Sequence, residues 1–129
     1  PTNVALNTNL NGIFIGKKES SNNLHLFHND ASGLCTEIDL GASYPFTNVT
    51  TYFYTLVIEK LFGTTDTVVT VTRTDEAGVS ISVQNTLTTN LPIGIANLSP
   101  FAYITNNATA SVASFKHYGC VVFNQRGIF

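Results

Sequence analysis

The chain has 129 residues and carries six basic and eight acidic side chains, which gives a net charge of −2 at pH 7. Charged residues form 11% of the sequence, against about a quarter in a typical globular protein. Because no basic patch is present that could neutralise several phosphates, the composition argues against nucleic-acid binding. Threonine and asparagine together make up about a quarter of the chain, so we expect a surface of hydroxyl and amide groups.

A chain of this length fits one domain, residues 1–129, that buries its core without metals or disulfides. Its mean hydropathy of +0.16 is high for a small domain and predicts apolar surface between identical copies in addition to the core. No apolar run approaches the roughly 18–20 residues of a membrane helix, which predicts no membrane insertion. The polar segment 1–9 lacks the basic start of a signal peptide and is expected to be an extended lead-in from an upstream shaft.

Apolar and polar residues alternate along the first part of the chain in the manner of β-strands rather than helices. The predicted strands are Gly12–Lys17, Asn23–His28 and Leu34–Leu40. Turn-forming residues separate these strands at 17–22 and 29–33. A loop held by Pro45 follows over residues 41–50.

The next segments also have the composition of strands. Tyr52–Leu61 is dense in aromatic and β-branched residues on both faces, which predicts a central strand covered on each side. Thr67–Arg73 places Val69 and Val71 on one face. In Val79–Val83 apolar residues alternate with serine, which predicts a sheet with one solvent-exposed face.

The last part of the chain predicts a loop containing Pro92, a strand from Leu98, an Asn106-Asn107 turn and a closing strand to Phe123. The whole chain then has about eight or nine short strands with turn signals every 8–12 residues. With little or no helical periodicity, the sequence predicts an all-β fold, an antiparallel β-sandwich or barrel.

Glu37 and Asp39 are the sharpest candidates for catalytic chemistry. Residues two apart on a strand point to the same face, so these carboxylates could line one cleft, as in the E-x-D-x-(x)-E strand of some concanavalin-like glycoside hydrolases. The third carboxylate is absent, because the chain continues Gly41-Ala42-Ser43. A retaining mechanism needs both a nucleophile and a separate acid. We therefore assign no catalytic residue, expect a solvated strand face, and predict that the protein is not an enzyme.

The histidines near the second predicted strand suggest a metal site only at first sight. His25 and His28 have opposite parity and are expected on opposite sides of the sheet. Only Asp30 and Cys35 could add ligands nearby, so no metal or other cofactor is assigned. We expect His28 to cap the hairpin instead.

His117 and Cys120 suggest a nucleophile pair, but three residues along a strand separate them across the sheet. Cys35 and Cys120 are the only cysteines. Buried free thiols are favoured for them over a disulfide that closes a long loop, and the bridge stays the alternative.

Aromatic side chains could stack on sugar rings where they are exposed. The candidates are Tyr44, Phe46, Tyr52, Tyr54, Tyr103 and Tyr118. Most lie in strand-like runs, so contact with the core or with another subunit is predicted for them. Tyr44 and Phe46 flank Pro45 in a loop, and the sequence does not decide between packing and sugar stacking for these two. No ligand-binding residue is assigned. The glycosylation sequons at 48–50 and 107–109 are expected by chance in a chain rich in asparagine and threonine.

Several segments, by their order and spacing, resemble domains of bacteriophage tail fibres and other virion structural proteins. These segments are Gly12–Gly16, Ile38–Pro45, Tyr52–Leu56, Thr88–Pro92, Leu98–Pro100 and the final strand. The similarity runs from the region of Leu10 to the end of the chain, although the tail Gln125–Phe129 departs from the usual ending.

This resemblance implies a concanavalin-like, lectin-like jelly roll in a virion that is assembled in the host cytoplasm. It implies a homotrimer that contacts other virion proteins. The implied function is non-enzymatic adsorption to a polysaccharide of the bacterial surface. A purely structural decoration or connector domain is the alternative, and a polysaccharide depolymerase is the third reading.

Overall fold

The computed structural model describes residues 11–18, 20–47, 51–60 and 63–92, and the structural statements below concern these residues. They form six strands and no helix, and every strand pair is antiparallel. The all-β prediction is confirmed for this part of the chain. None of the described residues belongs to a helix long and apolar enough to cross a membrane.

The first sheet is a meander of three strands with β2 in the middle. It consists of β1 (Asn11–Lys17), β2 (Leu24–Asp30) and β3 (Thr36–Asp39). In its register Phe27 of β2 lies between Phe14 of β1 and Glu37 of β3. The two phenylalanine rings stack with their centroids 5.1 Å apart. One face of this sheet therefore carries rings and carboxylates side by side.

The second sheet is also a meander, with β5 in the middle. It consists of β4 (Phe53–Lys60), β5 (Thr67–Thr74) and β6 (Ser80–Leu87). The turn between β5 and β6 is built by Asp75, whose Oδ1 accepts hydrogen bonds from the backbone N–H groups of Ala77 and Val79 at 3.0 and 2.9 Å. Gly78 has a φ of +82°, which glycine adopts without steric cost.

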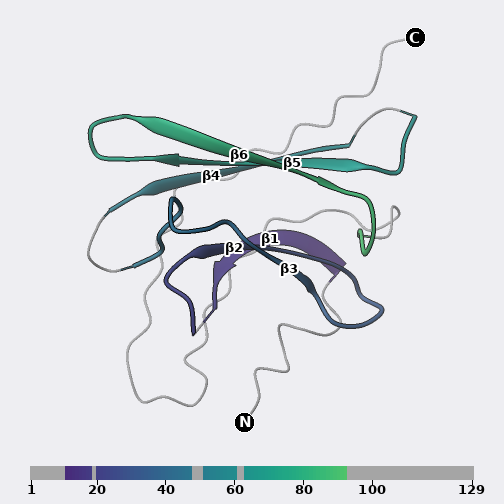
Figure 1. Ribbon diagram of the computed structural model, residues 1–129. Coiled ribbons are helices and arrows are strands. Elements are labelled where there is room, and N and C mark those ends of the chain that lie inside the picture. Colours follow the sequence, from purple (N-terminus) through teal and green to yellow (C-terminus); the bar gives the residue numbers. More distant parts are fainter. Residues whose placement is uncertain (1–10, 19, 48–50, 61–62, 93–129) are drawn as a thin grey trace.

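The two sheets lie one above the other as two layers, with the β4-β5-β6 sheet over the β1-β2-β3 sheet (Figure 1). Between them lie Leu24 and Leu26 of β2 and Val69 and Val71 of β5, each at most 2% exposed. Full burial of such a side chain stabilises the fold by about 1.5–3 kcal/mol. The alternation predicted for β5 is confirmed, since its outward residues are only half-buried.

The loop after β3 closes one side of the core. Leu24 N–H donates to the Tyr44 carbonyl at 2.7 Å, and Phe46 N–H donates to the Asn22 carbonyl at 2.7 Å. This pairing holds the Tyr44 ring at 5% exposure among the core side chains. The Tyr54 hydroxyl of β4 donates to the Pro45 carbonyl from the other layer. The loop thus joins the two sheets.

Asn90, three residues after β6, also connects the two sheets. Its backbone φ is +50°. Its Oδ1 accepts from the Asp30 N–H at 3.0 Å, and its Nδ2 donates to Thr36 Oγ1 at 2.9 Å and to the Leu34 carbonyl at 3.2 Å. His28 Nδ1 lies 3.0 Å from the Asn90 carbonyl, which can only accept. Asn90 therefore binds the β2–β3 hairpin to the end of the second sheet.

Four expectations about these elements are wrong. The turn predicted from residue 29 begins only after Asp30, because β2 continues through Asn29 and Asp30 in its pairing with β1. The strand near residue 79 is longer than predicted and ends at Leu87. β4 is not covered on both sides, because Phe53 and Val57 are each 49% exposed; aromatic and β-branched residues favour strands whether or not they are buried. His28 does not cap a hairpin, since it is 3% exposed and faces Asn90.

Other predictions lie outside the described residues. These are the strand from Leu98, the Asn106-Asn107 turn, the closing strand, the two sequons, and residues Tyr103, His117, Tyr118 and Cys120.

Candidate functional site

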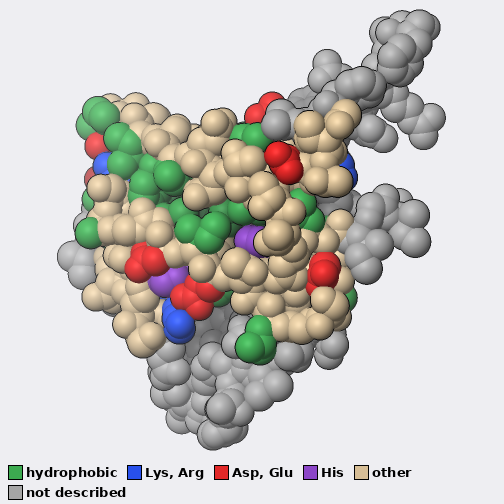
Figure 2. Space-filling view, turned by 45° about the vertical axis from the view of Figure 1, so that its right-hand side comes forward, with side chains coloured by type: hydrophobic (Ala, Val, Ile, Leu, Met, Phe, Trp, Pro, Cys, Tyr) green, Lys and Arg blue, Asp and Glu red, His purple; other side chains and the backbone are tan. Residues whose placement is uncertain are grey.

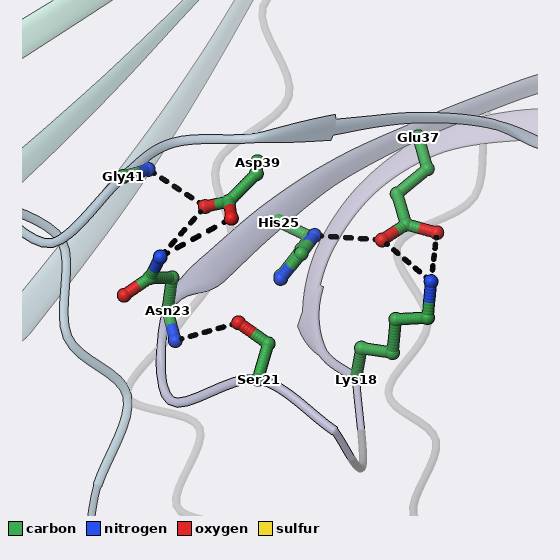
Figure 3. A network of polar contacts seen from close by, with 7 residues as sticks. All are labelled: Lys18, Ser21, Asn23, His25, Glu37, Asp39 and Gly41. Carbon is green, nitrogen blue, oxygen red and sulfur yellow. Dashed lines mark hydrogen bonds and ion pairs between the residues drawn. The ribbon is translucent and has the colours of Figure 1, made fainter.

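The two carboxylates singled out from the sequence do point to the same side of β3, where a polar network forms (Figure 3). Lys18 Nζ donates to Glu37 Oε1 and Oε2 at 3.2 and 3.1 Å. His25 Nδ1 lies 2.9 Å from Glu37 Oε1, within ion-pair distance but not oriented for a hydrogen bond. Glu37 is thus held between two side chains of other elements.

Asp39 is held by a second set of contacts in the same network. Its Oδ1 accepts from the Gly41 N–H at 2.8 Å, and both of its oxygens accept from Asn23 Nδ2, at 2.9 and 3.2 Å. These hydrogen bonds, led by the one from Gly41, lower the pKa of Asp39 below its ordinary value. A general acid in glycoside hydrolysis needs a raised pKa instead. These contacts therefore stabilise the loop after β3 and do not give Asp39 the raised pKa of a general acid.

The two histidines lie on opposite sides of the first sheet, as their parity predicts. His25 contacts Glu37 on the outer side, whereas His28 contacts Asn90 on the inner side. The His25 ring is stacked near Phe27 at 6.0 Å, and its Nε2 is buried with no hydrogen-bond partner among the described residues. No group of three His, Cys, Asp or Glu side chains in the described ranges converges as a metal site.

The other proposed ligands of a metal serve local structure. Asp30 Oδ1 accepts from the Ser32 N–H and hydroxyl, and these bonds lower the pKa of Asp30. Partial burial raises the pKa of the Cys35 thiol, which makes a thiolate less accessible at neutral pH.

Most of the described tyrosines serve packing. Tyr44 is buried, and burial raises the pKa of Tyr54 to about 12. The Arg73 guanidinium lies 4.7 Å from the centre of the Tyr52 ring and donates to the Ser43 carbonyl at 2.7 Å. Phe46 is 40% exposed and meets Tyr54 edge-on. Of the two loop aromatics, only Phe46 is open to solvent.

A different surface, which the sequence did not single out as a site, carries the exposed polar side chains of the second sheet. We call it the hydroxyl face: it is the side of β4, β5 and β6 turned away from the core. Its hydroxyl- or amide-bearing residues are Thr55, Thr70, Thr72, Thr74, Ser80, Ser82, Gln84 and Thr86. The outward residues of β4 and β6 are exposed, and those of the central β5 are half-buried.

Neighbouring strands of the hydroxyl face are linked side chain to side chain. Thr72 Oγ1 and Ser82 Oγ share a hydrogen bond of 2.7 Å, and Thr74 Oγ1 and Ser80 Oγ share another of 2.7 Å. A hydroxyl has one donor and two acceptor positions, so each pair keeps hydrogen-bonding capacity for a ligand. The hydroxyls are thereby oriented before any ligand arrives.

The hydroxyl face carries almost no charge. Glu59 is the one ionisable residue at the outward positions of β4, β5 and β6, and it lies at the end of β4 far from Phe53. The cation of β5, Arg73, has inward parity and is engaged with Ser43 and Tyr52. The sequence signal for this face was the alternation of valine with threonine in β5 and of apolar residues with serine in β6.

Comparisons with protein-family models, with curated proteins and with solved structures find no match.

Proposed function

We propose that the chain is a non-enzymatic module of a bacteriophage virion, the head domain of a tail fibre or similar appendage, which binds polysaccharide on the host cell. The hydroxyl face is the observation that carries this proposal. Sugars present hydroxyl groups that donate and accept hydrogen bonds, and apolar ring faces that stack on aromatic side chains. The hydroxyl face offers both, since Phe53 is 49% exposed beside its threonines and serines.

The rigidity of the hydroxyl face supports the same proposal. Its groups stand on strands rather than on loops, and the Thr72–Ser82 and Thr74–Ser80 pairs restrict their rotation. A surface ordered in advance loses less entropy when a ligand binds. The larger architecture that we propose is a jelly-roll sandwich of about eight or nine strands, to which the two described meanders contribute six.

Adsorption to host cells tests this proposal directly. The purified chain is expected to bind bacterial cells or their isolated surface polysaccharide, and Phe53→Ala is expected to weaken that binding. Tyr52→Ala is the matched control, because Tyr52 packs under Arg73 outside the hydroxyl face. A chain that binds neither cells nor polysaccharide contradicts the proposal.

The second candidate, a structural connector of the virion, is favoured by exposed apolar side chains. Hydrophobic side chains gather in a band from the upper left to the middle of the face in Figure 2. Phe53, Val57 and Ile58 of β4 are 39–49% exposed. Such side chains are suited to contact with identical copies, and a homotrimer is the assembly that we propose. Light scattering of the purified chain tests it, and a monomer at all concentrations contradicts it.

The third candidate, a polysaccharide depolymerase, depends on Glu37 and Asp39. Both carboxylates are engaged in the polar network, and the pKa of Asp39 is lowered. We expect the double variant Glu37→Gln/Asp39→Asn to leave any effect on polysaccharide chain length unchanged. Loss of a measurable depolymerising activity in that variant is the result that favours an enzyme.

A further inference from the structure

The hydroxyl face is not uniform, and its two ends differ in chemistry. Toward the Asp75–Gly78 turn, cross-strand neighbours are hydroxyl-bearing residues that adjoin an aromatic ring. We call this set the hydroxyl patch: Phe53, Thr55, Thr72, Thr74, Ser80 and Ser82. Toward the other end apolar, amide and acidic residues stand among the hydroxyls: Val57 and Glu59 on β4, Val68 and Thr70 on β5, and Gln84 and Thr86 on β6. The cross-strand contact there is a longer one, from the Gln84 amide to Thr70 Oγ1 at 3.4 Å. Both interstrand hydroxyl pairs at 2.7 Å lie within the hydroxyl patch.

The spacing within the hydroxyl patch suits a chain of sugars rather than a single small molecule. Thr55, Thr72 and Ser82 stand in one row across the three strands. Adjacent strands are about 4.8 Å apart, so the row presents a hydroxyl at regular steps over about 10 Å. Phe53 flanks the β4 end of this row, two residues before Thr55 on the same face.

The charges around the hydroxyl patch decide which class of sugar it suits. No outward residue of the patch is ionisable. Asp75 and Glu76 border it at the turn, and Arg73 is held away from it by Ser43 and Tyr52. An anionic sugar would meet no cation here and would lie near two carboxylates. A neutral sugar needs no counter-charge.

From these observations, and resting on the proposed function, we infer that the hydroxyl patch binds a neutral polysaccharide segment that lies across β4, β5 and β6. One sugar ring stacks on Phe53, and sugar hydroxyls exchange hydrogen bonds with Thr55, Thr72 and Ser82. Because the patch is uncharged, the binding is insensitive to salt within the range in which surface charges are screened.

Binding of the full chain to immobilised neutral mannan and dextran, and to anionic polygalacturonate, tests this inference at low and high salt. We expect a neutral polysaccharide to bind with the same affinity at both. Thr72→Val keeps the shape of the side chain and removes its hydroxyl, and we expect binding to weaken about 3- to 10-fold. Phe53→Ala is expected to weaken it about 10-fold.

Thr86→Val is the matched control, since it makes the same chemical change at the opposite end of the hydroxyl face and is expected to leave affinity unchanged. Salt-sensitive binding to polygalacturonate alone overturns the inference and leaves the proposed function standing. Equal effects of Thr72→Val and Thr86→Val also overturn it. Binding to host cells that no substitution in the patch affects also overturns the inference and leaves the proposed function standing. Binding to neither cells nor any polysaccharide contradicts the proposed function as well. Self-association that Phe53→Ala abolishes, without any glycan binding, assigns the patch to a second copy of the chain.

Discussion

The outward faces of the two sheets use polar side chains in opposite ways. On the β1-β2-β3 sheet, the carboxylates Glu37 and Asp39 are bound to Lys18, Asn23 and the Gly41 backbone, so their hydrogen-bonding capacity is used within the fold. On the β4-β5-β6 sheet, the outward polar side chains bond to one another across the strands, as hydroxyl pairs and as one amide–hydroxyl contact between Gln84 and Thr70. Those of β6 are exposed to solvent. The first face therefore contributes to stability, and the second remains available to a partner.

The largest expected effect concerns Asn90, which fixes the first sheet to the second. Asn90→Ala removes acceptor and donor contacts to Asp30, Leu34 and Thr36. We expect it to lower the free energy of unfolding by about 2–3 kcal/mol, because several hydrogen bonds are lost and the Asp30 N–H is left without its acceptor. Urea denaturation measures the loss. A change below about 1 kcal/mol contradicts the role of Asn90 as a connection between the layers.

Asn90→Gly separates the side chain from the backbone. The residue has a φ of +50°, which glycine adopts more easily than alanine. We therefore expect Asn90→Gly to be more stable than Asn90→Ala by about 1 kcal/mol. Equal stability of the two variants would place the whole effect in the lost side-chain contacts.

Tyr54 is a polar group of the second sheet that is engaged inside the fold, and its loss comes next in expected size. Loss of its hydrogen bond to the Pro45 carbonyl in Tyr54→Phe is expected to cost about 1 kcal/mol. Burial raises its pKa from 10.0 to about 12. Its contribution is therefore complete below pH 10 and is lost as the pH rises toward 12. Burial also raises the pKa of Tyr44, so absorbance titration should show that Tyr54→Phe has one late-ionising tyrosine fewer than the parent chain.

Asp39 gives the opposite dependence on pH in the first sheet. Hydrogen bonds from Gly41 and Asn23 lower its pKa from 3.8, so its contribution is present above that value and is lost as the pH falls through the lowered pKa. Asp39→Asn should therefore differ from the parent chain in stability at neutral pH and converge with it in acid. Glu59→Gln on the hydroxyl face is the control. A difference that persists in acid contradicts the assignment.

The smallest effect on stability is expected on the hydroxyl face. Thr72→Val should change the free energy of unfolding by less than about 0.5 kcal/mol, because valine also favours strands and the paired serine stays in contact with water. Thermal denaturation checks this. A loss as large as that of Asn90→Ala would mean that the hydroxyl pairs serve the fold, and the contrast between the two faces would disappear.

The sequence predicted the described strands well because alternation is a local property. The inward positions Val69 and Val71, the shared side of Glu37 and Asp39, and the opposite sides of His25 and His28 all follow from the two-residue period of a strand. The burial of β4 did not follow, since its apolar residues on both faces are compatible with either a central or an exposed position.

The partners of polar groups could not be predicted from the sequence. Asn23 and Asp39 are 16 residues apart, and His28 and Asn90 are 62 apart. The meeting of such groups depends on where turns and loops bring the chain. Asn90 lies within the Thr88–Pro92 segment, and only the packing of the layers gives it a contact with His28.

The sequence by itself determined that this chain forms antiparallel strands with apolar inward positions, that its surface is poor in charge, and that its carboxylates lack a third member. The tertiary structure decided which polar side chains are engaged within the fold and which are left for a partner. The physical reason is range: the direction of a side chain follows from its nearest neighbours along a strand, whereas its partner is brought to it by the stacking of two sheets.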